Sequence, residues 1–147
     1  MSRRKTANPE DLILFDCLAE AKQQLVDELK VEARQIQIIV PKDTLINFDP
    51  DHFKQIAWNL ASNAIKHGQT QELQMVAHSN TLDFKNQGEA FDEKKIRNLF
   101  EPFFTDHNRG TGLGLHICRQ LCHDNHADLS YHHINGQHVF RIEFNLG

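Results

Sequence analysis

The sequence is poor in cysteine and contains no long hydrophobic run, and each absence excludes a class of protein. Its 147 residues include only three cysteines, Cys17, Cys118 and Cys122. Three cysteines cannot all pair with one another, so a disulfide framework is not expected. No stretch of about eighteen apolar residues is present, and no apolar signal-peptide core is found. The sequence therefore predicts a soluble domain of a reducing compartment.

Length and charge predict one domain without a broad basic surface. A chain of 147 residues buries about two thirds of its unfolded surface, which is enough for a core without disulfides. Lysine and arginine number 16 against 20 aspartates and glutamates, so the balance does not favour a nucleic-acid partner. Any site for an anion must therefore be local.

The first half of the chain predicts strands and helices in alternation. Residues 1–10 are polar and basic and predict a flexible lead-in from a preceding domain, whereas residues 11–147 predict the folded domain. The expected elements are a strand at 12–15, a helix capped by Asp16, a strand at 36–40, and a long helix capped by Asp49 or Asp51 that ends near His67 with Gly68 as its stop. The apolar stripe of the long helix comprises Phe53, Ile56, Ala57, Leu60, Ala64 and Ile65.

The second half predicts hairpins around two further helices. In chain order the expected elements are strands at 73–77 and 81–84, a turn at 86–90, a helix at 92–100 capped by Asp92, an irregular stretch at 103–112, a helix that ends near Asn125, and strands at 128–132 and 139–144 joined by Asn135-Gly136. Ile96 and Leu99 are expected to face inward. This pattern predicts an α/β fold, a two-layer α/β sandwich with one mixed sheet and helices packed on one face.

The stretch from Arg109 to Leu115 carries the strongest functional signal. Its sequence is Arg-Gly-Thr-Gly-Leu-Gly-Leu, and it runs directly into an apolar-periodic segment. Because glycine has no Cβ, alternate glycines let the backbone lie close to a ligand, while the free amides of a first helical turn point at an anion. The stretch predicts binding of a nucleotide polyphosphate, with a plain loop before a helix as the alternative.

A group of polar residues lies on the long helix. Asn59, Asn63 and Lys66 are spaced i, i+4 and i+7, so they share a face next to the apolar stripe. The carbonyl oxygen of Asn63 suits a hydrated Mg²⁺ that also holds nucleotide phosphates, and Lys66 can meet those phosphates as a point charge. Solvated helix residues without a ligand are the alternative.

Three motifs, in this order, resemble the sequence boxes of sensor histidine kinases. Gln55 to His67 is similar to their N box, Phe100 to Phe104 to their F box, and Gly110 to Leu115 to their G2 box. The resemblance runs from about Leu12 to Phe144 and implies the GHKL or Bergerat ATP-binding fold, shared with the Hsp90 and MutL ATPases. Within the family, the lead-in and Leu99 to Thr105 most resemble the sensor kinases of type IV pilus regulation.

The resemblance also implies roles for single residues, with ATP and Mg²⁺ as cofactors. It implies Asn63 as the metal ligand, Asn59 and Lys66 as catalytic residues, and a lid at 103–109. The residues that it places at the nucleotide are Asn59, Asn63, Lys66, His67, Asn86, Gly88, Ala90, Phe91, Phe104, Arg109, Gly110, Thr111, Gly112, Leu113, Gly114 and Leu115. Related ATPases have a glutamate where this chain has Asn59, and an amide cannot act as that base. This difference favours phosphoryl transfer to a protein over hydrolysis.

The adenine loop departs from the family pattern. Residues 86–90 are Asn-Gln-Gly-Glu-Ala, where Asp-x-Gly-x-Gly is usual. The neutral Asn86 gives up charge assistance of about 1 kcal/mol, and Ala90 adds about 1 kcal/mol if its position needs a positive φ. Together these changes predict an ATP affinity lowered by about tenfold to thirtyfold. The alternative is a domain that has lost nucleotide binding and serves as a docking or regulatory module.

The phosphoacceptor expected of a histidine kinase is absent from the sequence. The resemblance implies a histidine followed by an acidic residue and then a proline, but the only such pair, His123-Asp124, follows the glycine stretch and no proline comes after it. We expect a monomeric catalytic fragment that does not autophosphorylate alone, from a homodimeric inner-membrane kinase whose catalytic domain is cytoplasmic. The implied partners are a phosphoacceptor domain and a response regulator that activates pilus genes. A serine kinase of the anti-sigma-factor type is a further alternative, disfavoured by Asn59 and by the F box.

Ten histidines also raise the question of a metal site. Four of them lie in one short stretch after Cys122, but their spacing matches no closed zinc pattern: His123, His126, His132 and His133. Surface imidazoles are the favoured interpretation. Cys118 and Cys122 are expected to be small core residues of one helix.

Overall fold

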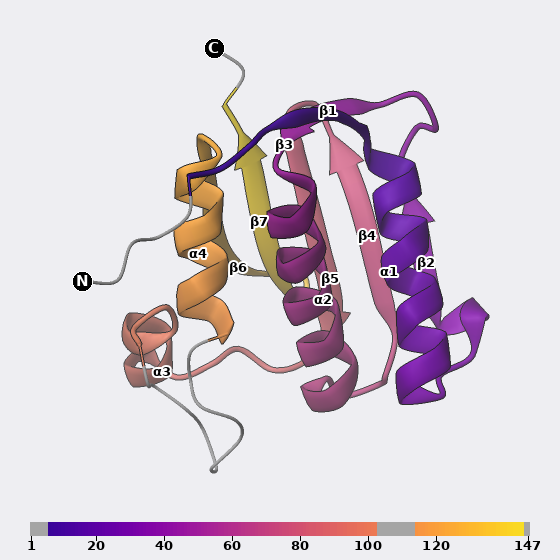
Figure 1. Ribbon diagram of the computed structural model, residues 1–147. Coiled ribbons are helices and arrows are strands. Elements are labelled where there is room, and N and C mark those ends of the chain that lie inside the picture. The colour runs from indigo at the N-terminus through magenta and orange to yellow at the C-terminus, as the bar shows by residue number, and fades with distance from the viewer. Residues whose placement is uncertain (1–5, 103–113, 146–147) are drawn as a thin grey trace.

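The computed structural model describes residues 6–102 and 114–145 and shows a two-layer α/β fold (Figure 1). In chain order the elements are β1 (Glu10–Ile13), α1 (Leu14–Leu29), a short 3-10 helix (Ala33–Gln35), β2 (Ile36–Ile39), β3 (Leu45–Phe48), α2 (Pro50–His67), β4 (Leu73–His78), β5 (Thr81–Gln87), α3 (Glu93–Asn98), α4 (Gly114–Asp124), β6 (Ala127–Ile134) and β7 (Gln137–Phe144). The helices α1, α2 and α4 lie side by side on one face of the sheet. This arrangement confirms the predicted α/β sandwich.

The described part of the main sheet has five strands in the order β2-β4-β5-β7-β6. The β2 and β4 strands are parallel, whereas the other neighbours are antiparallel, so the sheet is mixed as predicted. One row across its helix-covered face comprises Ile38, Met75, Phe84, Phe140 and Tyr131. On the opposite face the Arg141 guanidinium donates two hydrogen bonds, of 2.8 and 3.0 Å, to the carboxylate of Asp83. This ion pair links β5 and β7 on the face of the sheet that the helices do not cover.

A second, two-stranded sheet crosses the end of the domain where the chain begins. The β1 and β3 strands pair antiparallel, with Leu12 opposite Ile46 and Ile13 opposite Leu45. The sequence predicted a strand at 12–15, which overlaps the second half of β1, but it assigned no strand to β3. The pairing is long-range, and it brings residues before α1 next to residues before α2.

The α2 helix has the boundaries and the buried stripe predicted from the sequence. The Asp49 carboxylate accepts hydrogen bonds from the backbone amides of Asp51 and His52 at 2.9 and 3.2 Å, so Asp49 is the N-cap. At the other end the Gly68 amide donates to the carbonyl of Ala64 at 2.9 Å. Six predicted stripe residues are each at most 8% exposed, so the helix is fixed on the sheet: Phe53, Ile56, Ala57, Leu60, Ala64 and Ile65.

Three local predictions were wrong. The α1 helix begins at Leu14, before Asp16, and its N-cap Ile13 makes no side-chain capping bond. Residues 86–87 continue β5 instead of forming a turn, because cross-strand pairing with β7 satisfies their backbone and overrides their turn propensity. The helix expected at 92–100 ends at Asn98, and Ile96 is 45% exposed although Leu99 is buried as expected. The expected irregular stretch at 103–112 lies outside the described residues.

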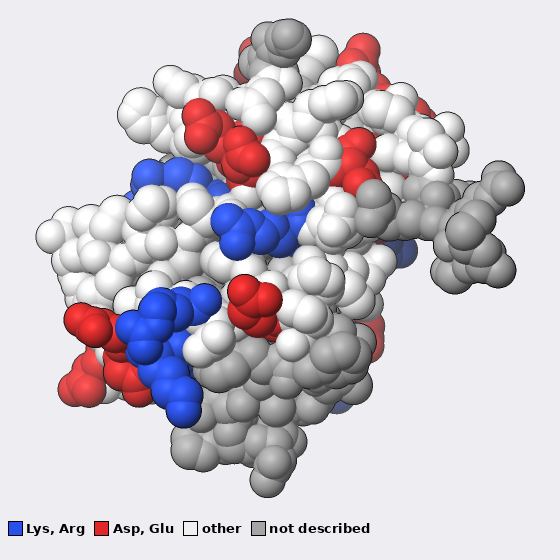
Figure 2. Space-filling view, turned by 90° about the vertical axis from the view of Figure 1, so that its left-hand side faces the viewer, with Lys and Arg blue, Asp and Glu red and all other residues white. Residues whose placement is uncertain are grey.

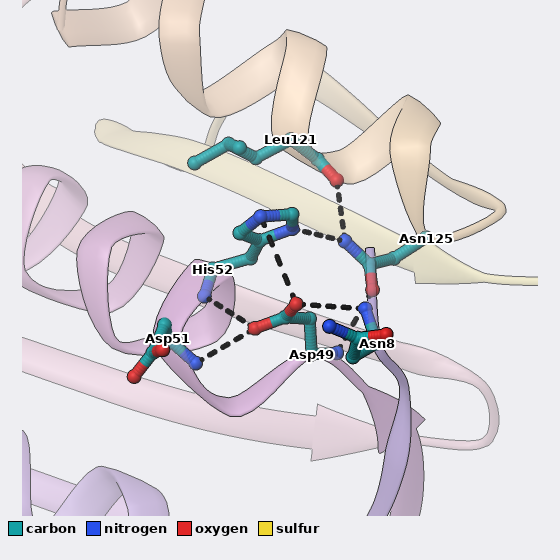
Figure 3. A network of polar contacts seen from close by, with 6 residues as sticks. All are labelled: Asn8, Asp49, Asp51, His52, Leu121 and Asn125. Atoms are coloured by element: carbon teal, nitrogen blue, oxygen red, sulfur yellow. Dashed lines mark hydrogen bonds and ion pairs between the residues drawn. The ribbon is translucent and has the colours of Figure 1, made fainter. Parts of the chain in front are cut away.

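A polar network ties the lead-in to the start of α2 and the end of α4 (Figure 3). The backbone amide of Asn8 donates to the Asp49 carboxylate at 2.8 Å, and the Asp49 amide donates to the side-chain oxygen of Asn125 at 2.8 Å. The Asn125 side-chain nitrogen donates to the Leu121 carbonyl at 2.8 Å and lies 3.0 Å from Nδ1 of His52. The Asn8 amide is the largest of the causes that hold the pKa of Asp49 below its usual value. The network therefore fixes three segments that are distant in sequence.

Asn125→Ala is expected to lower the free energy of unfolding by about 2 to 3 kcal/mol, because the Asp49 amide would lose its partner in a buried site. Urea denaturation followed by circular dichroism measures this change. Asn145→Ala is the matched control, since its exposed side chain makes a single 3.3 Å hydrogen bond to Asp128, and it should shift stability by less than about 0.5 kcal/mol. Equal losses for the two variants would contradict the structural role of Asn125.

Candidate functional site

The predicted site residues gather at the end of the domain opposite the lead-in network (Figure 1). Here α2 ends, β5 ends and α4 begins. A Cβ on Gly114 would lie 3.9 Å from the side-chain oxygen of Asn59, and a Cβ on Gly68 would lie 2.8 Å from the side-chain nitrogen of Asn86. The fold therefore brings together the asparagine helix, the end of β5 and the last glycine of the glycine stretch.

The polar face of α2 contains one held amide and one free amide. Asn59 is half-buried and its side chain hydrogen-bonds the thiol of Cys118 on α4. Asn63, one turn further, is also half-buried, but its carboxamide makes no hydrogen bond within the described part of the chain. Lys66 and His67 are exposed at the end of the helix. The helix thus presents Asn63 and Lys66 toward whatever occupies this end of the domain.

Asn86 is a buried amide without a protein partner. It lies in β5 opposite His138 of β7 and is only 7% exposed, yet its carboxamide makes no hydrogen bond to any residue that the structure describes. The polar atoms of this carboxamide are not among the fully buried ones, so a ligand can reach them. The Thr70 hydroxyl oxygen is fully buried with no partner in the described chain, and a buried polar atom left unpaired costs about 1 to 3 kcal/mol. Unpaired polar groups at one end of a domain indicate a place where a polar ligand completes the structure.

The loop after Asn86 differs in part from what its sequence predicted. Gly88 does not have a positive φ; among the described glycines only Gly136 does. A glycine is required at position 88 because a Cβ there would lie 2.4 Å from Nε2 of His138. Ala90 is exposed and also lacks a positive φ, so the condition on which the Ala90 penalty depended is not met. Of the two expected penalties on ATP affinity, only that of the neutral Asn86 remains. It amounts to about 1 kcal/mol, or roughly a fivefold weaker affinity.

Sequence reasoning missed an aromatic cluster that packs behind this loop. The Phe91 ring stacks on the rings of His138 and Tyr131, with centroids 4.3 and 5.0 Å apart, and the Lys95 ammonium lies 4.1 Å from the Phe91 centroid. Burial raises the pKa of Tyr131 to about 12. Burial, with the nearby charges of His133 and Lys95, lowers the pKa of His138. The only sequence signal for this cluster is the register that pairs β5 with β7, which no local pattern specifies.

Some predicted site residues lie outside the described part of the chain. These are the lid at 103–109 and the residues Phe104, Arg109, Gly110, Thr111, Gly112 and Leu113. Of the glycine stretch, Gly114 and Leu115 are described: both are half-buried at the start of α4, and Leu115 packs against the core. Phe100 of the F box packs edge-on against Phe140, and Arg119 lies over its ring.

Charge near the site is mixed in sign. Figure 2 shows the face that carries α3 and α4, where Lys and Arg side chains form separate groups with Asp or Glu side chains close by. Within residues 6–102 and 114–145, no group of three or more His, Cys, Asp or Glu side chains could hold a metal ion. Cys118 and Cys122 are fully buried, and burial raises the pKa of both thiols, so the prediction that they are core residues is confirmed.

The fold and this geometry agree with comparisons to known proteins. The profile of the histidine kinase-, DNA gyrase B- and HSP90-like ATPases matches residues 48–147. The chain belongs to this family. The match covers α2, the end of β5 and the start of α4, which are the described segments that meet at this end of the domain. Within the family, the curated and solved relatives of the chain are sensor histidine kinases, so it is an ATP-binding catalytic domain of that type.

Two curated relatives match nearly the whole chain. The sensor protein kinase PilS of Pseudomonas aeruginosa is 31% identical over 98% of this chain and 29% of its own length. Sporulation kinase A of Bacillus subtilis is 29% identical over 96% of this chain and 24% of its own length. The chain therefore spans less than a third of these relatives.

Solved structures of two histidine kinases show the same fold. The nucleotide-free catalytic domain of histidine kinase ThkA superimposes with a TM-score of 0.75 at 23% identity, over 93% of this chain and 95% of that one. The Acinetobacter baumannii histidine kinase AdeS gives a TM-score of 0.76 at 18% identity, over 96% of this chain and 68% of that one. In the described residues of this chain, no helix is both long and apolar enough to span a membrane.

Gly88→Ala is expected to destabilise the fold by about 1 to 3 kcal/mol, because the new methyl group would overlap the His138 imidazole. Thermal unfolding measures the change, and the double variant Gly88→Ala with His138→Ala should recover part of the Gly88→Ala loss as a coupling energy. Gly136→Ala is the control for a glycine with open space around it but a φ of +75°. The close approach of His138 is contradicted if the Gly88 and His138 effects are additive.

Proposed function

We propose that this domain binds Mg²⁺-ATP at the meeting point of α2, β5 and α4 and transfers the γ-phosphoryl group to a histidine on a separate phosphoacceptor domain of the same kinase. The observation that carries the proposal is the Asn86 carboxamide: the residue is only 7% exposed and lies beside the end of α2, yet its polar atoms make no hydrogen bond within the described chain and stay open to a ligand. A nucleotide base supplies the donor and acceptor that this group lacks. Family membership supports the same assignment.

The residues present fit the nucleotide and the metal. The Asn86 side-chain oxygen accepts from the exocyclic amine of the base, and the Asn63 carbonyl oxygen is the hard, neutral ligand that Mg²⁺ takes together with waters and phosphate oxygens. Lys66 at the end of α2 would meet the phosphates with its charge, and Gly114 and Leu115 would present backbone amides of the first turn of α4. When bound, Mg²⁺ neutralises charge on the transferring phosphoryl group.

Asn59 favours transfer to a protein acceptor over hydrolysis. Its side chain is half-buried and held by the Cys118 thiol, so it presents a fixed amide beside Gly114. An amide orients a neighbour but does not take a proton at neutral pH, so Asn59 cannot activate water as a base. An imidazole acceptor brings its own nucleophilic nitrogen and needs no such base.

The similarity to PilS supports a role in the control of type IV pilus genes. We place residues 1–10 as the lead-in from a dimerisation and phosphoacceptor domain, and residues 11–147 as the catalytic domain of a homodimeric inner-membrane sensor. One solved relative is histidine kinase ThkA in complex with response regulator protein TrrA. By analogy we propose that the kinase containing this domain acts on a response regulator, a PilR-like transcriptional activator. The isolated domain is then a monomer without nucleic-acid affinity.

Mixing the domain with a separately produced phosphoacceptor domain and radiolabelled ATP is expected to label the acceptor only when Mg²⁺ is present, and to leave the catalytic domain unlabelled. Asn63→Ala should slow labelling by about tenfold to a hundredfold, the effect of losing a contact to a charged ligand worth about 1.5 to 3 kcal/mol.

Asn47→Ala is the matched control, because Asn47 is an exposed asparagine on β3, bonded to Asp11 at the opposite end of the domain. Its labelling rate should equal that of the wild type. Rapid labelling of the catalytic domain by itself, or equal rates for Asn63→Ala and the wild type, would refute the proposed phosphotransfer.

A further inference from the structure

Two histidines on the last two strands support the loop that follows Asn86. The carbonyl oxygen of Gly88 lies 2.8 Å from Nε2 of His133 on β6, so a protonated Nε2 donates to it, and the amide of Gly88 donates to the carbonyl of Gly136 at 3.2 Å. Beneath the same glycine lies the His138 imidazole, too close to allow any side chain at position 88. Gly88 thus accepts a hydrogen bond from the His133 imidazole and packs against the His138 imidazole.

A hydrogen-bond chain fixes the orientation of the His138 ring. The Phe91 backbone amide donates to the hydroxyl oxygen of Tyr131, and that hydroxyl lies 2.6 Å from Nδ1 of His138. Burial raises the pKa of Tyr131 to about 12, so the hydroxyl keeps its proton. The short contact is satisfied when this hydroxyl donates to Nδ1 of a neutral His138 whose own proton is on Nε2. The neutral ring then stacks flat on Phe91.

We propose that His133 and His138 are positioning residues for nucleotide binding: the hydrogen bond that His133 donates and the neutral imidazole of His138 hold the loop from Gly88 to Phe91 in the conformation that keeps Asn86 directed at the base. This inference rests on the proposed nucleotide site and extends it to two residues that act on the loop. His138 lies beside Asn86, since the two residues are directly opposed in the β5–β7 pair.

Protonation of His138 is opposed by burial and by its neighbours Tyr131, His133 and Lys95. A proton on Nδ1 removes the acceptor for the Tyr131 hydroxyl, and the new charge lies in an aromatic stack next to His133 of β6 and Lys95 of α3. Burial is the main cause that lowers the pKa of His138, and the two neighbours add to it. The supporting contact is therefore complete above the ordinary histidine pKa of about 6.5 and is lost as the pH falls below it.

The His133 bond responds differently to pH, which separates the two residues experimentally. Protonated His133 still donates from Nε2 to the Gly88 carbonyl, so its contact survives at low pH. A glutamine at this position also presents an N–H donor, whereas an alanine does not. His132, its neighbour on β6, faces the other side of the sheet and contacts Ser130 at 3.0 Å, so it is a matched control.

Calorimetric titration with Mg²⁺ and a non-hydrolysable ATP analogue, at pH 7.5 and 5.5, tests the proposal. At pH 7.5, His133→Ala is expected to raise the dissociation constant about threefold to tenfold, with His133→Gln restoring most of the affinity and His132→Gln unchanged. Between pH 7.5 and 5.5 the wild-type constant should rise by about threefold or more relative to that of His138→Gln. This comparison cancels the titration of the nucleotide itself.

A direct readout keeps the proposal testable if His138→Gln folds poorly. By thermodynamic linkage, nucleotide binding must lower the pKa of His138 by about half a unit or more, which nuclear magnetic resonance of the wild-type imidazole measures. An unchanged His138 pKa on binding, or equal affinities for His133→Ala and the wild type, would overturn the inference while leaving the proposed function in place. A folded wild-type domain that binds no nucleotide at pH 7.5 would instead overturn the proposed function.

Discussion

The packing of α2 on the sheet is the constraint on which the rest of the structure depends. Its apolar stripe is almost fully buried, so the rotation of the helix about its axis is fixed, and the asparagine face must point toward α4 and the end of β5. The helix is also fixed along its length, by the Asp49 cap at one end and by the close approach of Gly68 to Asn86 at the other. Stability and site geometry therefore have the same origin.

Polar side chains are hydrogen-bonded to one another at one end of the domain, whereas some at the other end lack a partner in the described chain. At the lead-in end, Asp49, His52 and Asn125 satisfy one another and the Asn8 amide in a closed network. At the other end, the amides of Asn63 and Asn86 have no partners among the described residues. A fold that leaves such groups unpaired gives up stability at that place, and a ligand recovers it. The contrast supports the proposed nucleotide site by an argument that uses no relative.

Local signals in the sequence predicted the elements whose ends are set by nearby residues. Asp49 and Gly68 bound α2, Asp92 caps α3, and Asn135-Gly136 closes the β6–β7 hairpin, all as expected. Features set by long-range pairing were not predictable. The pairing of β1 with β3, the continuation of β5 through Asn86, and the contact of His138 with Gly88 depend on which strands become neighbours. The shared helix of Asn59, Asn63 and Lys66 was predictable because helical spacing is a local property.

Calorimetric titration of the folded wild-type domain with a non-hydrolysable ATP analogue, with and without Mg²⁺, tests the central claim most directly. The account predicts saturable binding that is stronger with Mg²⁺, because Asn63 contributes to the metal shell and Asn86 pairs with the base. An absence of binding at millimolar nucleotide would contradict the account and would identify the domain as a docking or regulatory module.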